Sequence, residues 1–378
     1  MKFFHISDIH LGKRLNEYSL LEDQRYILSQ IIGAVDAEKP DALLIAGDIY
    51  DKSIPPVEAV TLFDDFLYEL TRRKLPVLLI SGNHDSAERV TFGARLFTRS
   101  GLYFAPAYQG AVTPVTLQDE YGAVDFYLLP FVKPSHVRRF HTDDEIATYT
   151  DAIRCAIGHM PLEANRRNVL VTHQFVTGAT LSDSEEISVG GSENVDASVF
   201  DGFDYVALGH IHGPQQVSSE RIRYCGSPLK YSFSEAGHQK SITVVQLSQK
   251  GQMQLSTIPL MPKRELRKLQ GRFEELTDPT FYSRQDRDAY LQITLTNDEL
   301  IPDAMHTLRR IYPNLLNLLF DNRRTAAQQV INASAEQEMR SPEALFAELF
   351  QLQNNQPMTD EQYEYVRRLV EQIREEQE

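Results

Sequence analysis

The sequence predicts a mixed α/β protein with a parallel sheet flanked by helices, followed by a small α+β domain and a pair of helices. Two observations carry this prediction. Short apolar runs alternate with segments of helical periodicity over residues 2–80, and such an alternation builds a parallel sheet. The pattern then changes after residue 262, where further domains are expected.

The first sheet is expected to start with the apolar run at residues 2–6. The next elements follow from the same alternation, because apolar residues at helical spacing indicate helices and short bounded apolar runs indicate strands. In chain order they are a helix over 19–39, a strand over 42–46, a helix over 57–73 and a strand over 76–80.

A second set of strands is expected between residues 103 and 247. In chain order we predict strands within 103–131, a helix over 151–158, and strands over 168–172, 205–208, 222–225 and 241–247. We expect the last of these strands to be antiparallel and to pack against the first sheet. The polar loop 177–194 interrupts the set, and so long a loop in a compact domain is commonly functional.

The chain after residue 262 begins with a strand, an amphipathic helix and a short strand over residues 290–320. Two helices then start at Ser341 and Thr359, each with a capping signal in Pro342 or Gln362. The sequence therefore predicts four parts: a main domain at 1–262, a small α+β domain at 263–324, a linker at 325–340 and a helix-loop-helix segment at 341–378.

Large apolar side chains line one side of each C-terminal helix. Two short helices cannot bury all of these side chains against each other, which favours a partner that covers them. A helical hairpin folded onto the preceding small domain is the alternative.

Composition is typical of a globular protein, with 42% hydrophobic and 24% charged residues. No apolar run approaches the ~20 residues that span a bilayer, and the acidic, His-bearing opening predicts no signal peptide. The two cysteines lack C-x-x-C spacing. They favour the reducing cytoplasm and argue against both a disulfide framework and a thiolate zinc site.

The net charge of −15 is unusual for a protein that binds nucleic acid. It is unevenly distributed, because residues 1–262 carry −9 whereas residues 263–324 carry +1 and include the basic stretch KRELRK. Bound metal ions can also invert a local acidic field. The overall charge therefore does not exclude a nucleic-acid substrate.

Polar side chains with metal-binding chemistry follow the predicted strands. Asp8 and His10 follow the first one, although this stretch alone favours a capped strand end with a solvated Asp and His. Four later clusters repeat the pattern, and α/β sheets bind ligands beyond the carboxyl ends of their strands. Oxygen and nitrogen donors suit two divalent ions, with Asp48 as a bridge. The candidates are Asp8, His10, Asp48, Asn83, His173, His210 and His212.

These residues resemble the motifs of the calcineurin-like metallophosphoesterases. The motifs appear in family order as D-x-H at 8–10, G-D-x-x-D at 47–51, G-N-H-D at 82–85, a single His at 173 and G-H-x-H at 209–212. The resemblance implies a sandwich of two sheets flanked by helices. It also implies one metal held by Asp8, His10 and His212, another held by Asn83, His173 and His210, and a bridging Asp48.

Two more residues acquire roles from this resemblance. His84 would face the phosphate, either as the acid for the leaving oxygen or as a cation in the transition state; ordering of its loop is the alternative. Asp51 would orient a histidine ligand or the His84 ring. The other histidines, at 5, 136, 141, 159, 238 and 306, are expected in the core, on the surface or at helix ends.

Longer stretches resemble the SbcD family of bacterial double-strand-break repair nuclease subunits. They are HISDIHLGK from residue 5, GDIYDKSIPP from 47, SGNHDS from 81 and YCGSPLKYSFSEAGHQKS from 224. The last stretch lies outside the phosphoesterase motifs and supports the resemblance independently. Asp51 is a departure from archaeal and eukaryotic relatives, which have a DNA-contacting histidine there, so that contact is not implied.

The SbcD resemblance implies a manganese-dependent enzyme that degrades duplex DNA ends 3′ to 5′ and nicks single strands and hairpins by two-metal hydroxide attack. Mg²⁺, Fe²⁺ or Zn²⁺ are alternative ions. The small domain would cap the DNA. Residues 341–378 would dock on an SbcC-type ATPase of the SMC class, and ATP would act only through this partner. The complex would be a heterotetramer that contains a dimer of nuclease subunits. It would be associated with the nucleoid.

Two other function classes are alternatives. A small-molecule phosphodiesterase or phosphatase would share the metal core, but it leaves the parts after residue 262 unexplained. A noncatalytic scaffold would not need seven aligned ligands. Cleavage of hairpin DNA with manganese, with and without the ATPase, distinguishes the three.

Overall fold

The computed structural model describes residues 1–16, 18–182, 185, 194–299, 301–321, 346–347, 350, 358–359 and 362–366. The chain forms two compact units, of which the first comprises Met1–Leu269, Thr277–Ile293 and Asp303–Leu318, and the second comprises Gln270–Leu276, Thr294–Pro302 and Leu319–Glu378. All the predicted site residues belong to the first unit.

The first sheet has six strands in the order β14-β13-β1-β4-β5-β6. They are β1 (Lys2–Ile6), β4 (Ala42–Ala46), β5 (Val77–Ile80), β6 (Leu102–Phe104), β13 (Ser241–Leu247) and β14 (Met253–Pro259). The run from β1 to β6 is parallel, as predicted, because α1 (Leu21–Glu38) and α2 (Val57–Arg72) form the crossovers. The short elements of this half are β2 (Arg14–Leu15), β3 (Tyr18–Ser19), α3 (Ala87–Val90), α4 (Ala94–Phe97) and η1 (Thr98–Ser100).

The second sheet has the order β11-β12-β10-β9-β8-β7. Its strands are β7 (Val115–Asp119), β8 (Gly122–Leu129), β9 (Arg167–His173), β10 (Tyr205–Gly209), β11 (Gln215–Val217) and β12 (Ser219–Tyr224). The helical elements of this half are α5 (Pro134–Arg138), α6 (Tyr149–Gly158), η2 (Ala197–Phe200) and η3 (Phe233–Gly237).

The expectation of late antiparallel strands packed on the first sheet was wrong in two respects. β12 lies parallel to β10 in the second sheet. The chain between them first forms β11, which is the edge strand and pairs antiparallel to β12, so that β12 runs in the same direction as β10. β13 is antiparallel, but it joins the first sheet beside β1 instead of packing on its face. Both pairings join distant segments, which the local apolar pattern does not specify.

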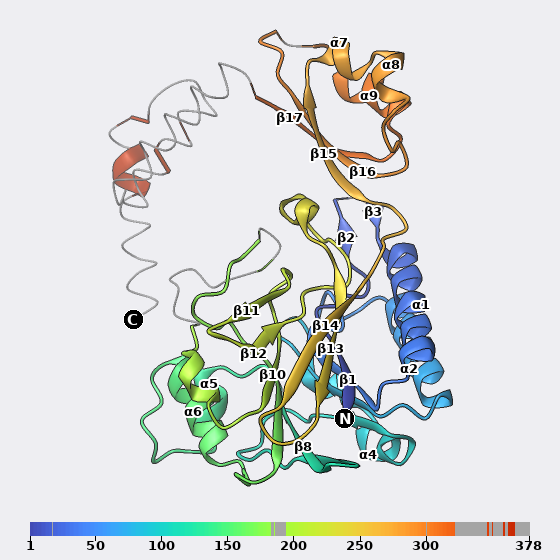
Figure 1. Cartoon of the computed structure of the whole chain (residues 1–378). Helices are drawn as coiled ribbons and strands as arrows, with labels where there is room; N and C mark the ends of the chain where they lie inside the picture. The colour runs from blue at the N-terminus through green and yellow to red at the C-terminus, as the bar shows by residue number, and fades with distance from the viewer. Residues whose placement is uncertain are drawn as a thin grey trace. The chain divides into compact units, whose positions relative to one another are not determined.

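Alternating side chains divide the core into three layers. Phe4, Leu43 and Ile45 face the layer that α1 and α2 cover, whereas Phe3 and Leu44 point into the layer between the two sheets. The outer face of the second sheet packs against α6. Figure 1 shows the resulting order of helices, sheet, sheet and helices, which confirms the predicted sandwich.

A separate three-stranded sheet has the order β15-β16-β17. Its strands are β15 (Leu266–Gly271), β16 (Tyr290–Leu295) and β17 (Leu315–Phe320), and the nearby helices are α7 (Phe273–Leu276), α8 (Pro279–Tyr282) and α9 (Ala304–Ile311). The apolar pattern did not predict β15, because this strand begins in the charged stretch KRELRK. Two basic residues of that stretch are engaged by acids of α1, since Arg264 donates to Glu22 and Asp23, and Lys263 pairs with Glu22.

The predicted linker and most of the C-terminal helical pair lie outside the described residues. One local prediction in this region is confirmed. The Thr359 amide donates to the Gln362 side chain at 3.0 Å, and the Gln362 amide donates to the Thr359 hydroxyl at 3.3 Å. No helix in the described part of the chain has both the length and the apolar composition of a membrane span.

Candidate metal centre

Four predicted ligands lie in loops with left-handed backbone. The φ angles are 52° for Asp8, 47° for His10, 49° for Asp48 and 99° for His210, a conformation that costs free energy for residues other than glycine. The first two loops hold each other in place, because the Asp8 and His10 amides donate to the carbonyls of Gly47 and Asp48, each at 3.0 Å. Asp8 and His10 therefore converge because of the turn that follows β1.

The glycines of the motifs permit this close approach. A Cβ at Gly82 would lie 2.1 Å from Oδ1 of Asp48, and a Cβ at Gly209 would lie 1.8 Å from the Ala46 carbonyl oxygen. Real Cβ atoms do not approach other atoms this closely. Gly82 therefore lets two loops of the first sheet pack together, and Gly209 lets the end of β10 in the second sheet meet β4 in the first.

One group of donors contains Asp8, His10 and His212, whose ligand atoms lie within 4.8 Å of one another. Nε2 of His10 is 3.1 Å from Nε2 of His212. On its other side the His212 ring donates from Nδ1 to Glu235 at 3.3 Å, so its Nε2 keeps the lone pair. The outer hydrogen bond orients this ring as metal-bound histidines are usually oriented.

A second group contains Asn83, His173 and His210. Nδ1 of His173 donates to the Ala46 carbonyl at 2.8 Å, and Nε2 of this ring lies 3.0 Å from Oδ1 of Asn83. Nδ1 of His210 lies 3.0 Å from the same amide oxygen. Three donors from the ends of β5, β9 and β10 thus converge on one point.

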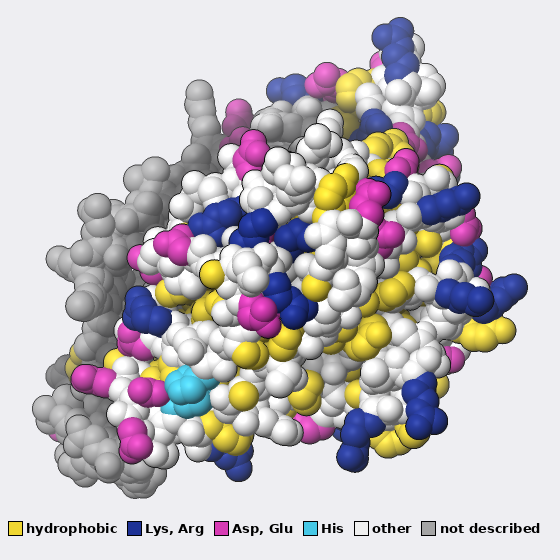
Figure 2. All heavy atoms as spheres, turned by 60° about the horizontal axis from the view of Figure 1, so that its bottom comes forward, with side chains coloured by type: hydrophobic (Ala, Val, Ile, Leu, Met, Phe, Trp, Pro, Cys, Tyr) yellow, Lys and Arg dark blue, Asp and Glu magenta, His cyan; other side chains and the backbone are white. Residues whose placement is uncertain are grey.

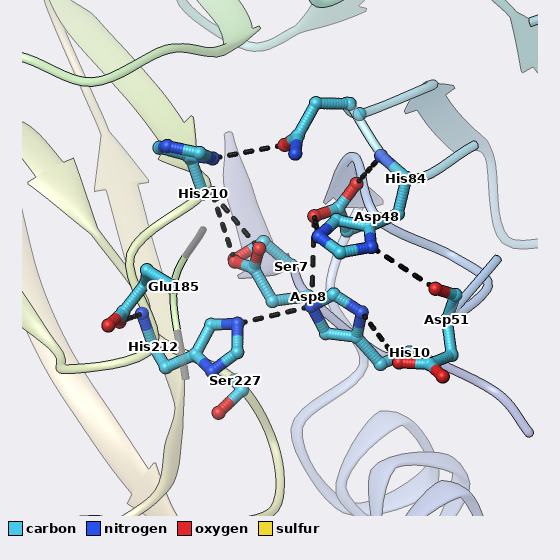
Figure 3. Close-up of polar contacts among 12 residues, drawn as sticks. Ser7, Asp8, His10, Asp48, Asp51, His84, Glu185, His210, His212 and Ser227 are labelled. Atoms are coloured by element: carbon cyan, nitrogen blue, oxygen red, sulfur yellow. Dashed lines mark hydrogen bonds and ion pairs between the residues drawn. The ribbon is translucent and has the colours of Figure 1, made fainter. Parts of the chain in front are cut away.

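Asp48 has neighbours in both groups, and Figure 3 shows its carboxylate beside His10 and the backbone of His84. Its Oδ2 is 3.3 Å from Nε2 of His173 and 3.7 Å from Nε2 of His10. Neighbouring ligands of one octahedral ion, each about 2.1 Å from it, are about 3.0 Å apart. The spacing between His10 and His212 and the two spacings from Asn83 to His173 and His210 are close to this value, so these donors suit divalent ions.

The electrostatics of the centre also fit cations. Burial lowers the pKa of His10, and it lowers the pKa of His210 to about 3, so both rings are neutral and can offer lone pairs. Burial raises the pKa of Asp8 to about 6, because its carboxylate is removed from water. Nδ1 of His10 is buried without a hydrogen-bond partner. Cations beside these groups would compensate for the buried negative charge.

His84 lies at the mouth of the centre, with 17% of its side chain exposed. Its Nδ1 donates to the backbone carbonyl of Asp51 at 3.1 Å, and its Nε2 is 4.0 Å from Oδ2 of Asp48. The Asp51 carboxylate instead accepts from Lys13 at 2.7 Å and lies 3.9 Å from Nδ1 of His10. The backbone of Asp51 therefore contacts the His84 ring, while its side chain faces Lys13 and His10.

Sequence reasoning missed three residues that support the ligands. Glu235 is fully buried, accepts from His212 and pairs with Lys240, which also donates to the His212 carbonyl at 2.8 Å. The Asp85 carboxylate accepts from the amides of Ile49 and Tyr50 and so fixes the loop that carries Asp48. The signal for Glu235 and Lys240 was present in the stretch from residue 224, which carried the family resemblance without an assigned role.

A cavity of about 540 Å³ opens beside Asn83. Lys133, His136 and Arg139 line one part of its wall, and Asp85 and Glu88 line another, so basic groups are present at the approach to the metal centre although the chain is acidic. On the face of the molecule in Figure 2, Lys and Arg side chains are interspersed with Asp and Glu side chains. The negative net charge is therefore not a uniform acidic coat on that face.

Sequence comparison relates the chain to known families. The calcineurin-like phosphoesterase profile matches residues 1–214, and a profile described as the Type 5 capsule protein repressor C-terminal domain matches residues 262–354. Among the curated relatives, the SbcD subunit of the nuclease SbcCD from Staphylococcus epidermidis is 37% identical over 329 residues. The matched residues are 85% of this chain and 87% of that protein.

Two solved structures show weaker similarity. A dimetal phosphatase from Danio rerio has 12% identity and a TM-score of 0.43, over 69% of this chain and 97% of its own. A phosphoesterase from E. coli has 13% identity and a TM-score of 0.28, over 69% of this chain and all of its own.

The fold, the donor arrangement and the profile match define a calcineurin-like phosphoesterase, an enzyme that cleaves phosphoesters with divalent metal ions. Within this class the chain belongs to the SbcD family of nuclease subunits, because the identity to a curated member extends over most of both chains. The resemblance to this family is thereby confirmed.

Proposed function

We propose that this chain is a manganese-dependent nuclease that degrades duplex DNA ends 3′ to 5′ and nicks single strands and hairpins. The Staphylococcus relative is named as part of a nuclease. The single observation that carries the chemistry is the position of Asp48, whose Oδ2 faces His173 of one donor group and His10 of the other. A carboxylate so placed suits a site for two ions.

In this proposal Asp8, His10 and His212 hold one ion, Asn83, His173 and His210 hold the other, and Asp48 contacts both. Two divalent ions bound there would polarise the phosphodiester and acidify an attacking water. The residues around the centre fix two of these rings through an outer hydrogen bond, since Glu235 accepts from His212 and the Ala46 carbonyl accepts from His173. Manganese suits a set of nitrogen and oxygen donors without sulfur.

His84 is proposed to act on the leaving oxygen. Its Nδ1 is committed to the Asp51 carbonyl, so only Nε2 is available to the substrate. In the protonated ring this nitrogen would give its proton to the departing 3′- or 5′-oxygen. Asp51 is thus proposed to act as a positioning residue, through its backbone carbonyl and not through its carboxylate.

DNA is proposed to approach along the basic wall that contains Lys133 and Arg139, with residues 263–324 acting as a cap. Phosphate contacts of this kind supply sequence-independent affinity that decreases with added salt. The division into a main domain at 1–262, a cap at 263–324, a linker at 325–340 and a docking segment at 341–378 remains part of the proposal.

The direct test uses labelled hairpin and blunt duplex DNA with Mn²⁺, with and without the ATPase partner. We expect hairpin nicking and shortening of duplex ends from the 3′ side. The matched control is Asp48→Ala, for which we expect loss of both bound manganese and cleavage. Hydrolysis of a cyclic nucleotide with DNA left intact would support the small-molecule phosphodiesterase instead.

The proposed partner is an SbcC-type ATPase of the SMC class, in a heterotetramer with two nuclease subunits at the nucleoid. The name of the Staphylococcus relative presents it as one component of a complex, SbcCD. Phe346 and Tyr365 in the segment 341–378 have 47% and 69% of their surfaces exposed, which leaves apolar area for a helical partner.

Deletion of residues 341–378 tests the docking segment. We expect the truncated chain to lose co-purification with the ATPase while it keeps its manganese. Unchanged co-purification would assign docking to another surface.

A further inference from the structure

A second cluster of metal-binding side chains lies outside the catalytic centre. His141, Asp144, Cys155 and His159 each place one ligand atom within 4.8 Å of the others. Cys155 lies in α6 and His159 is the residue that ends this helix, and a spacing of four residues puts both side chains on one face. His141 and Asp144 come from the loop that follows α5.

The distances fit one small ion. Sγ of Cys155 is 3.3 Å from Oδ2 of Asp144, and Nδ1 of His141 is 4.0 Å from the same oxygen. Ligands at about 2.0–2.3 Å from a tetrahedral ion are separated by about 3.3–3.8 Å. The separation between Cys155 and Asp144 already lies in this range, and only the separation between His141 and Asp144 has to shorten for both residues to bind one ion.

The two rings lie side by side at this cluster. The His141 and His159 ring centroids are 4.1 Å apart, and Sγ of Cys155 is 3.8 Å from Nδ1 of His159. The same Nδ1 donates to the Cys155 carbonyl at 2.9 Å. Coordination through Nε2 of His159 keeps this hydrogen bond as an outer support, whereas coordination through Nδ1 replaces it.

An outer hydrogen bond prepares His141 for coordination. Its Nε2 is 2.9 Å from the Gly110 carbonyl oxygen and 2.9 Å from the Tyr108 hydroxyl. A carbonyl only accepts, so Nε2 carries the proton and Nδ1 keeps its lone pair on the side of Asp144. Histidines that bind metals typically have this donor bond to a carbonyl on the far nitrogen.

The donor set differs from that of the catalytic centre in one decisive way. It contains a sulfur, together with two imidazoles and one carboxylate, and this combination suits Zn²⁺ better than Mn²⁺ or Mg²⁺. The Asp144 side chain is 51% exposed, so an ion can enter from solvent. The Cys155 thiol donates to Asp144, and coordination would replace this S–H bond by an S–metal bond and release the proton to water.

We propose that His141, Asp144, Cys155 and His159 form a mononuclear site for a thiophilic divalent ion such as Zn²⁺, separate from the catalytic ions. The site would tie the loop after α5 to the end of α6. Tyr108, which contacts His141, also lines the cavity beside Asn83. A bound ion would therefore stiffen one wall of that cavity. This assignment replaces the expectation that the sequence holds no thiolate zinc site.

Cobalt titration of the full-length protein tests the proposal, because thiolate coordination gives a sulfur-to-cobalt charge-transfer band that nitrogen and oxygen ligands do not give. We expect one equivalent of Co²⁺ beyond the ions held by the catalytic centre to produce this band and Zn²⁺ to abolish it. Cys155→Ser should remove the band, whereas the matched control Cys225→Ala should keep it, since the chain has only these two cysteines. Absence of the band in the unmodified protein, or its persistence in Cys155→Ser, would overturn the site.

Two further variants test whether the cobalt signal comes from this cluster, and not from a change in folding or from the catalytic centre. His141→Ala leaves the thiol in place and should lower the apparent cobalt affinity at least about tenfold, comparable to the loss of one ligand or its support. Asp48→Ala should lose the manganese of the catalytic centre yet keep the thiolate band in full. A band lost together with the catalytic manganese would assign the sulfur signal to that centre and refute a separate site.

Discussion

Glu235 shows how a residue without contact to substrate can set the strength of the metal centre. It is buried and accepts from Nδ1 of His212, and Lys240 balances its charge. This arrangement fixes which nitrogen of His212 carries the proton and increases the basicity of the other nitrogen.

We predict that Glu235→Gln weakens metal binding roughly 10–100-fold, the usual effect of losing such an outer partner. Manganese titration of cleavage, together with direct measurement of bound metal, checks the prediction. Glu120→Gln replaces an exposed glutamate and should leave both unchanged. If Glu235→Gln and the unmodified protein bind manganese with equal affinity, Glu235 does not support His212 as a metal ligand.

His84 separates metal binding from catalysis. Because it sits at the mouth with its Nε2 4.0 Å from Asp48, its removal deletes no proposed ligand. We predict that His84→Ala keeps its manganese and loses roughly 10²–10⁴-fold in cleavage rate, the range expected for a general acid. Single-turnover cleavage at saturating Mn²⁺ measures this effect. A rate near that of the unmodified protein would exclude His84 from the mechanism.

At this scale the sequence predicted which residues gather but not how each is held. The seven candidate ligands meet, because strand ends are the places where α/β sheets present side chains. The partners of these residues, such as Glu235 with His212, are far apart in the chain and carry no local signal. The proximity of His141 to Cys155, on which the proposed second metal site depends, was not predicted for the same reason, although the Cys-x-x-x-His spacing of Cys155 and His159 was visible.

The loops that follow the strands are held in position by close backbone contacts between the two sheets. A side chain at Gly209 would meet the Ala46 carbonyl at 1.8 Å and Nδ1 of His173 at 2.6 Å. We predict that Gly209→Ala costs about 3 kcal/mol of stability or more, as expected for a rigid overpacked contact, and reduces metal binding because His173 must move.

The matched control for Gly209→Ala is Gly33→Ala in α1, where nothing lies within 4 Å of the added atom. This change should stabilise the helix by roughly 0.5–1 kcal/mol. Urea unfolding of both variants measures the two opposite effects. Equal stability of Gly209→Ala and the unmodified protein would show that the loops of the two sheets can separate without cost.

The positions of helices and strands were predicted well where a local apolar pattern determines them. The pairing partners of strands were predicted poorly, because pairing depends on segments elsewhere in the chain. The helices α1 and α2 and the strands β4 and β5 follow directly from apolar spacing and bounding prolines. The partners of β12 and β13 do not, since parallel or antiparallel pairing across the sheets is decided by distant chain segments. The charged β15 has no apolar signal of a strand.

At the scale of the molecule, Arg167 joins the two sheets. Its guanidinium donates to the Leu247 and Ser248 carbonyls at the end of β13 at 3.2 and 2.8 Å, and it pairs with Asp119 of β7. The hydrogen bonds from Arg167 hold the pKa of Asp119 well below its usual range.

We predict that Asp119→Asn lowers stability by about 2 kcal/mol at neutral pH, the contribution of hydrogen bonds to a charged group. A depressed pKa gives stability that is fully present above about pH 4 and is lost as the pH falls. The difference between the two proteins should therefore shrink below about pH 4, which urea unfolding over this range measures. Asp201→Asn, at an exposed ion pair with Arg221, should change stability by under about 1 kcal/mol at any pH. A penalty for Asp119→Asn that does not vary with pH would contradict an ionic role.

The left-handed turns at Asp8, His10, Asp48 and His210 have a consequence for the supply of metal. Such backbone angles persist only where the surrounding structure holds them, and the hydrogen bonds from the Asp8 and His10 amides to the Gly47 and Asp48 carbonyls contribute to this support. We therefore expect the chain to exchange its ions without unfolding. The metal that the proposed site carries would then depend on the supply of ions as well as on their affinity.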